Sequence, residues 1–156
     1  MGEAASAATG DIPDNQVFLT FTDPTAGYSL KYPEGWAQRG RGAQVTFSDK
    51  NNVIRLVIVP AGKPTLHEAA TGLGRGATTR VSAPARALIV GGKPAVKLSY
   101  RTVSAPNPVT GKRVTLVVDR YYFWHRGKRA ILDLGTAVGV DNVDAYRLIS
   151  ESFRWR

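Results

Sequence analysis

The sequence contains one partial match to a metal-binding motif. His67-Glu68 begins like the HExxH zinc helix, in which two histidines one turn apart bind the metal, but Thr71 occupies the position of the second histidine. The only other histidine is His125, and there is no cysteine. The lack of cysteine excludes disulfides, thiolate ligands and a cysteine nucleophile. We therefore predict no bound metal and no cofactor.

Three glycine-containing segments bear a partial resemblance to phosphate-binding loops. Gly92-Lys93 and Gly111-Lys112 each lack both the first glycine of the motif and the Ser or Thr that should follow the lysine. Residues 72–76 are rich in glycine but have neither the G-x-G-x-x-G spacing nor a preceding strand. We interpret that segment as a loose helix end, and we predict no phosphate loop.

Two acidic residues are candidates for paired carboxylate chemistry. Asp119 and Asp133 fall on adjacent predicted strands, where a general acid and base could approach each other. Basic neighbours, Arg120 and Arg129 among them, favour ion pairing instead. No serine stands in a G-x-S-x-G elbow. The sequence therefore predicts no catalytic residues and a protein that is not an enzyme.

Basic and aromatic side chains are concentrated between residues 112 and 129. Because strand residues alternate between faces, Tyr122 and Trp124 should share one side and Tyr121, Phe123 and His125 the other. Such rings could stack on single-stranded nucleic acid, with Trp36 as a further platform, or they could fill the core on both faces of a central strand. We favour the core interpretation, because no nucleic-acid-binding motif accompanies the cluster.

The charge of the chain is strongly basic and unevenly distributed. The 156 residues carry a formal net charge of +9, although residues 1–34 hold five acidic side chains and one basic one. Fourteen of the 21 basic residues are arginines, which bind carboxylates and phosphates in a planar fork. One interpretation is an ordinary solvated surface; the other is a surface for a protein or anionic partner. The candidate contacts lie in predicted turns and loops: Arg39, Arg41, Lys112, Arg113, Arg126 and Lys128.

The elements that would position these residues are mostly strands joined by hairpins. Alternating or continuous apolar runs predict strands at residues 17–21, 28–32, 45–47, 53–59, 87–90, 95–103, 113–124 and 129–136. The strand at 53–59 is nearly all apolar and is expected to be covered on both faces. Thr65 with Glu68 predicts a capped helix, and a second helix should follow Asp141. This order of elements predicts an α+β fold with an antiparallel sheet.

Several of these segments together resemble the PsbP family of photosystem II extrinsic proteins. Residues 21–23 and 27–36, which end in Tyr-Pro-Glu-Gly-Trp, resemble the opening hairpin of the family, and residues 45–49 resemble its next strand. Residues 126–128 and the closing Ser152-Phe153-Arg154 resemble its last hairpin and final helix. The resemblance spans residues 17–156. It implies an α/β/α sandwich in which helices pack on the faces of a central antiparallel sheet.

The resemblance also implies a type of function. Members of the wider superfamily are mostly non-enzymatic binding or assembly modules, and many are exported bacterial proteins, including lipoproteins. We therefore expect a tail or linker at residues 1–16, one domain at 17–156, and an extracytoplasmic location. Association with a membrane would require an anchor that this sequence lacks. The alternatives are a single-stranded nucleic-acid binder, and a small-ligand carrier or enzyme that uses a cleft of the sandwich.

Overall fold

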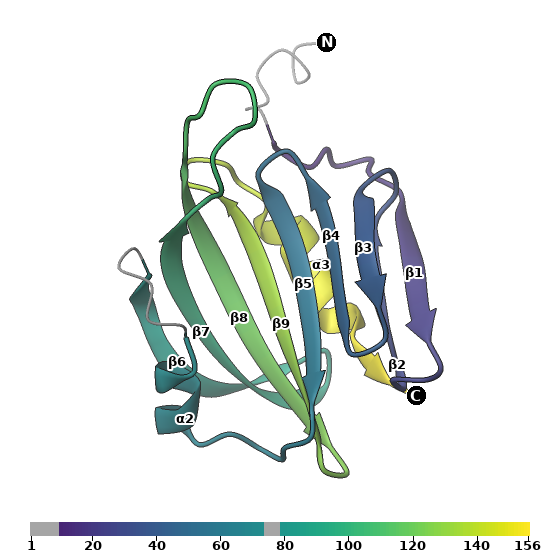
Figure 1. Cartoon of the computed structure of the whole chain (residues 1–156). Coiled ribbons are helices and arrows are strands. Elements are labelled where there is room, and N and C mark those ends of the chain that lie inside the picture. Colours follow the sequence, from purple (N-terminus) through teal and green to yellow (C-terminus); the bar gives the residue numbers. More distant parts are fainter. Residues whose placement is uncertain (1–9, 74–78) are drawn as a thin grey trace.

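The described part of the chain forms two antiparallel sheets and two helices (Figure 1). The structure, a computed structural model, describes residues 10–73 and 79–156. Its elements in chain order are β1 (Phe18–Asp23), β2 (Tyr28–Pro33), β3 (Ala37–Arg41), β4 (Gln44–Asp49), β5 (Asn52–Val59), α2 (Leu66–Thr71), β6 (Arg80–Val90), β7 (Lys93–Val103), β8 (Thr115–His125), β9 (Lys128–Ala137), α3 (Val143–Ser152) and β10 (Arg154–Trp155).

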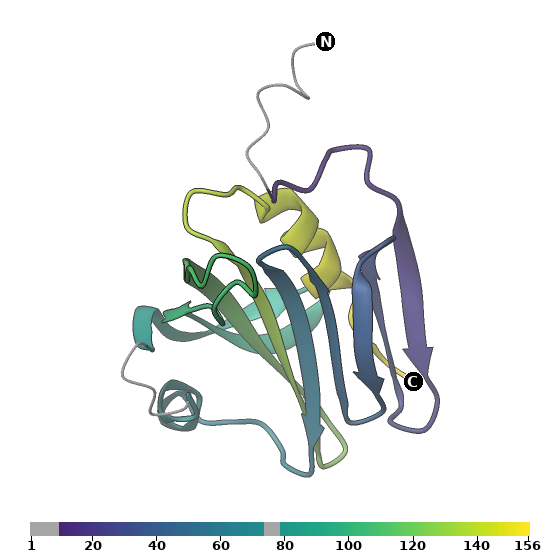
Figure 2. The same cartoon turned by 45° about the horizontal axis from the view of Figure 1, so that its top comes forward.

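The larger sheet has seven strands in the order β3-β4-β5-β9-β8-β7-β6, and the smaller has three in the order β1-β2-β10. Every strand pair in both sheets is antiparallel. Helices α2 and α3 lie on opposite sides of the larger sheet (Figure 2). This arrangement confirms the α+β fold, with helices packed on both faces of an antiparallel sheet.

The inner face of the larger sheet carries the main core. Alternate residues of its central strands, among them Phe47, Ile54, Leu132 and Phe123, pack there against α3 and the smaller sheet. Helix α3 contributes Ile149, which is completely buried. Burial of such side chains is the main source of stability in a fold of this kind. The inner face is therefore covered from β4 to β8.

The outer face has a smaller cluster that forms where α2 crosses β7 and β8. Ala69 of α2 packs there on Val96, Leu98 and Tyr122. Thr65 and Glu68 form the predicted capping box, since each side chain accepts the other residue's backbone N–H. With only six residues, α2 covers one part of the outer face and leaves the rest uncovered.

Several sequence predictions need correction. Val53 and Val57 are only half-buried, so β5 is fully covered on one face and not on both. The N-cap of α3 is Asn142 and not Asp141, although the Asp141 carboxylate accepts the N–H of Val143 at 3.1 Å. Strand β3 was not predicted, because all five of its residues are exposed and it has no alternating apolar pattern.

The beginning of the described chain contacts the sheet and α3. Gly10 accepts a hydrogen bond from the Asn52 side chain at 2.6 Å, and the Ile12 N–H donates to Asn142 at 2.8 Å. Residues 1–9 of the predicted tail and residues 74–76 of the predicted loose helix end lie outside the described residues. In the part of the chain that the structure describes, no helix is long and apolar enough to cross a membrane.

Candidate functional site

The uncovered part of the outer sheet face carries arginines from two strands. Residues directly opposite one another on neighbouring strands share a face, and Phe47 of β4 points into the core. Because strand residues alternate between faces, Thr46 and Gln44 of the same strand project outward. The residues paired to them on β3 and β5 project outward as well. We call this surface the open face; its outward residues are Arg39, Arg41, Gln44, Thr46, Arg55 and Val57.

The three arginines of the open face lie close together. Thr46 is opposite Arg39 on one side and Arg55 on the other, which places these two strands about 10 Å apart. Arg41 follows Arg39 by two residues, or about 7 Å along the strand. All three are exposed, and among residues 10–73 and 79–156 none of them takes part in a salt bridge. Asp23 attracts Arg41 without forming a salt bridge, so the face still presents positive charge.

Asp133, an acidic residue beside the open face, is already paired. It stands opposite Arg55 across β5 and β9, but its two oxygens accept hydrogen bonds from Arg120 at 2.7 and 2.8 Å. Although burial opposes a charged guanidinium, this carboxylate raises the pKa of Arg120. Tyr100 donates to the same carboxylate at 3.2 Å, and burial raises the pKa of its phenol to about 12. Asp133 therefore stabilises the fold and leaves Arg55 unpaired.

Two further predicted contacts, Arg126 and Lys128, lie at the turn between β8 and β9, at the bottom of Figure 1 near the β3–β4 turn. Arg126 is exposed at the tip of the turn, where its φ of 47° is in the left-handed region. Lys128 is half-buried; its Nζ donates to the Ala26 carbonyl at 3.0 Å and lies 5.5 Å from the centroid of the Trp155 ring. Arg126 is therefore an exposed charge at the same end of the sheet as the β3–β4 turn, whereas Lys128 is held by contacts within the protein.

Lys112 and Arg113 lie at the other end of the molecule. They belong to the segment that joins β7 and β8, at the top of Figure 1. The 11 residues of β8 separate this segment from Arg126 by about 35 Å. Arg113 also donates to the Ser104 carbonyl at 3.2 Å. The six predicted contacts therefore do not form one continuous surface.

The residues considered for catalysis have structural partners. Asp119 and Asp133 project from opposite faces of the sheet, so they cannot act as a carboxylate pair. Both form ion pairs, as predicted: Asp133 with Arg120, and Asp119 with Lys97 at 3.9 Å. Glu68 belongs to the capping box. In the described part of the chain, no three His, Cys, Asp or Glu residues are grouped so that they could hold a metal ion.

The aromatic cluster is part of the core, as predicted. Tyr121, Tyr122 and Phe123 are 7%, 2% and 1% exposed, and they alternate between the inner and outer clusters. Trp36 is 9% exposed, and half-buried Trp124 lies under the Lys63 ammonium at 5.7 Å. These rings are not free to serve as stacking platforms for bases.

Arg55 is the open-face residue that the sequence analysis missed. In the sequence it is the one charged residue of the nearly all-apolar strand at 53–59, and it is not among the six predicted contacts. Its immediate neighbours Ile54 and Leu56 are completely buried, and alternation therefore requires Arg55 to point outward. The alternation alone could have indicated that orientation, but its closeness to Arg39 depends on the pairing of β3, β4 and β5.

Asp23 ties the turn that carries Arg41 to the smaller sheet. Its carboxylate accepts the N–H groups of Ala26 at 2.9 Å and Gly42 at 2.6 Å. These backbone hydrogen bonds, that from Ala26 foremost, lower the pKa of Asp23 despite the opposing effect of burial. Asp23 thus holds the β3–β4 turn in place, and with it one end of the open face.

A change at Asp23 should have a pH-dependent effect on stability. An aspartate in the unfolded chain has a pKa of about 3.9, and the lower folded value means that the native state binds fewer protons. Its stabilisation is therefore complete above the unfolded pKa and is lost as the pH falls through the folded value. We expect Asp23→Asn to lower the free energy of unfolding by about 1.5–3 kcal/mol at neutral pH. Urea titrations at several pH values should show this difference shrinking below about pH 4; a constant difference would contradict the assignment.

Comparison with known proteins identifies related sequences and folds. The model of the PsbP family matches residues 16–120. No curated protein matches the sequence. The solution structure of cyanobacterial PsbP (CyanoP) from Synechocystis sp. PCC 6803 superposes with a TM-score of 0.66 at 19% identity, covering 95% of this chain and 99% of that one.

Two more distant structures share the fold. A crystal structure from Bacteroides thetaiotaomicron has a TM-score of 0.59 at 12% identity and covers 88% of this chain, which spans 48% of that protein. The Ran-binding protein Mog1p of Saccharomyces cerevisiae has a TM-score of 0.53 at 8% identity, with 90% of this chain and 96% of that one covered. At these identities the likeness concerns the fold alone.

Proposed function

Since the chain belongs to the PsbP family, we propose that it is a non-enzymatic binding module whose open face docks an acidic protein partner. The observation that supports this proposal is the group of three exposed arginines, Arg39, Arg41 and Arg55, none of which forms a salt bridge within the described residues. The planar guanidinium group of arginine binds a carboxylate through two parallel hydrogen bonds. Complementary charge on two proteins raises their association rate and favours the correct partner.

The shape of the surface supports a macromolecular partner. The open face is part of a broad sheet; two of its arginines come from β3 and one from β5, with β4 between these strands. Between them lie Thr46, Gln44 and the half-buried Val57, which add hydrogen-bonding groups and some apolar area. A polar patch with arginines is a common composition for a transient protein interface. One solved structure of this fold is a Ran-binding protein, so the fold has been used for binding proteins.

We further propose that the protein works outside the cytoplasm as an exported bacterial module. This part of the proposal rests on its membership of the PsbP family and on the small residues that dominate positions 2–10. A fusion of the natural gene product to a periplasmic or surface reporter in the source cell would test it.

The docking proposal can be tested with defined probes. A fluorescent polyglutamate peptide should bind the protein at low salt, and a triple variant Arg39→Gln/Arg41→Gln/Arg55→Gln should bind about tenfold more weakly or worse, because three charge contacts are lost. Fluorescence anisotropy measures both affinities. High salt should weaken wild-type binding, since exposed charges are screened beyond about 8–10 Å.

A matched control separates the open face from total charge. The variant Lys50→Gln/Lys112→Gln/Arg113→Gln also removes three positive charges, but at the opposite end of the molecule, and should leave the peptide affinity within about twofold. Equal losses in both variants would show a non-specific charge effect and overturn the proposal. Tighter binding of an oligothymidine of equal length would instead support the nucleic-acid alternative.

A further inference from the structure

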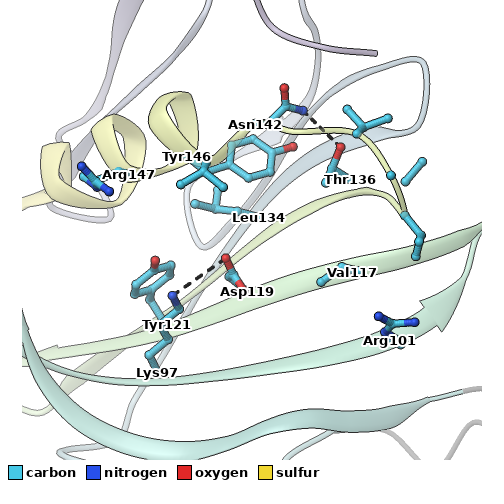
Figure 3. Close-up of a pocket in the computed structure, with 15 residues that line it drawn as sticks. Lys97, Arg101, Val117, Asp119, Tyr121, Leu134, Thr136, Asn142, Tyr146 and Arg147 are labelled. Carbon is cyan, nitrogen blue, oxygen red and sulfur yellow. Dashed lines mark hydrogen bonds and ion pairs between the residues drawn. The ribbon is translucent and has the colours of Figure 1, made fainter. Parts of the chain in front are cut away.

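A groove lies on the other side of the sheet, between β7, β8 and β9 on one side and the start of α3 on the other (Figure 3). Its volume is about 470 Å³, which falls within the range of pockets for small ligands. Apolar side chains from the sheet and α3 line part of it, including Val117, Leu134 and Val143. The groove is therefore a concave site with room for a small organic molecule.

Positive side chains from both walls reach this groove. Lys97 and Arg101 come from β7, and Arg147 comes from α3 (Figure 3). The one acidic lining residue is Asp119, whose carboxylate is held by the Ser99 hydroxyl at 2.6 Å and by Lys97 at 3.9 Å. Three basic residues and one acidic residue line the groove, so the lining carries a net positive charge. Within the described residues, Arg101 and Arg147 form no salt bridge.

The pairing of β6 with β7 concentrates still more positive charge beside the groove. Arg80 stands directly opposite Arg101, and Arg86 directly opposite Lys97. Leu88 and Ala95, two positions along the strands from Arg86 and Lys97, belong to the inner cluster. Because strand residues alternate between faces, both like-charge pairs lie on the inner face. Like charges directly opposite each other on antiparallel strands destabilise the sheet. Two such pairs, with Ala83 and Ser99 between them, are a cost to the fold that a bound anion would relieve.

Irregularities in β6 create this arrangement. The register shifts between Val81 and Ala83 and again between Ala83 and Arg86, so six residue steps of β6 span four steps of β7. Arg86 and Lys97 belong to the regular register that starts at the β6–β7 turn, and without the two shifts that register would place Ser82, not Arg80, opposite Arg101. Bulges of this kind re-aim side chains and are frequent beside functional sites. The pair of Arg80 and Arg101 thus depends on a specific feature of the backbone.

We propose that this groove binds a small organic anion, whose phosphate or carboxylate group is attracted by the positive charge of Lys97, Arg101 and Arg147 along the groove and whose apolar body contacts the groove lining. Arginine forks bind both kinds of head group through charge-assisted hydrogen bonds. The site is distinct from the open face, because the two lie on opposite faces of the sheet. The inference therefore does not depend on the docking of a protein partner.

Calorimetric titration with 1-naphthyl phosphate and with 2-naphthoate tests the proposal. At least one of the two should bind, and the comparison tells which head group the groove prefers. The double variant Arg101→Gln/Arg147→Gln should weaken binding about tenfold or more, since two positive charges of the groove are lost, and with them a hydrogen bond to a charged group. Both residues are exposed, so these substitutions should leave the fold intact. Val143→Trp should also weaken binding by filling the groove.

Matched controls make the result decisive. Arg39→Gln/Arg41→Gln removes the same charge from the open face and should leave the affinity for the naphthyl probe unchanged, even if polyglutamate binding is lost. Neutral 1-naphthol should bind much more weakly than its phosphate ester. The proposal would be overturned by equal affinities for naphthol and naphthyl phosphate, by an equal loss in Arg39→Gln/Arg41→Gln, or by no binding of either anion at millimolar concentration.

Discussion

Asp133→Ala is expected to destabilise the protein by about 3–5 kcal/mol, because it leaves the half-buried Arg120 guanidinium without its partner. The Asp133 side chain is 8% exposed and accepts two hydrogen bonds from Arg120 and one from Tyr100. Arg120 also lies 5.5 Å from the Tyr100 ring centroid. Loss of the carboxylate therefore leaves one charged group and one hydroxyl in the outer cluster without their hydrogen-bond acceptor. Urea denaturation at neutral pH measures the effect.

Asp119→Ala is the matched control for this prediction. Asp119 occupies the neighbouring position to Arg120 on β8 but has a side chain that is 33% exposed and an ion pair of 3.9 Å. We expect its loss to cost about 1 kcal/mol or less, since partly exposed ion pairs contribute little. Replacing Arg120 and Asp133 together by Met and Leu should recover most of the lost stability. Equal costs for the two alanine variants would contradict the special role of Asp133.

Phe153→Ala is expected to lower the free energy of unfolding by about 3–5 kcal/mol, because it opens a cavity where α3 meets both sheets. Phe153 is completely buried. Its ring stacks on Phe123 at a centroid distance of 4.8 Å and on Tyr28 at 6.2 Å, and it meets the edge of Trp155 at 5.1 Å. The residue thus joins the larger sheet, the smaller sheet and the end of α3. Thermal and urea unfolding should both show the loss.

Phe18→Ala provides the comparison for this second prediction. Phe18 begins β1, is only half-buried, and packs at the margin of the same cluster. Its truncation should cost less than half as much, because neighbouring side chains and water can occupy the space. A cost for Phe153→Ala no greater than that for Phe18→Ala would show that the stacked rings do not hold the two sheets together.

Local pattern was enough to predict most elements of the fold. The capping box of α2, the hairpins at residues 91–92 and 126–127, and the alternating faces of β8 all depend on residues near one another in the chain. The physical reason is that caps, tight turns and strand alternation are local properties of the backbone. By contrast, β10 has two residues and exists only because Arg154 and Trp155 pair with β2.

The partition of the aromatic residues was also predictable. Tyr122 faces the outer cluster while Tyr121 and Phe123 face the inner one, as the period of two requires. Their burial followed from the expectation that a central strand is covered on both sides. Family membership was predicted from the turn at residues 32–36 and the closing residues 152–154, because turn geometry restricts sequence strongly.

The candidate sites depended on register, which one sequence does not specify. Arg39 and Arg55 are 16 positions apart and meet only because both pair with Thr46. Arg80 faces Arg101 only because β6 contains two register shifts. Lys112 was predicted as a contact together with Arg41, but it lies at the other end of the sheet. The sequence thus determined the elements and the sign of the charge, because these are local or additive properties. Tertiary structure decided where the charge gathers, because strand pairing joins residues that are distant in the chain.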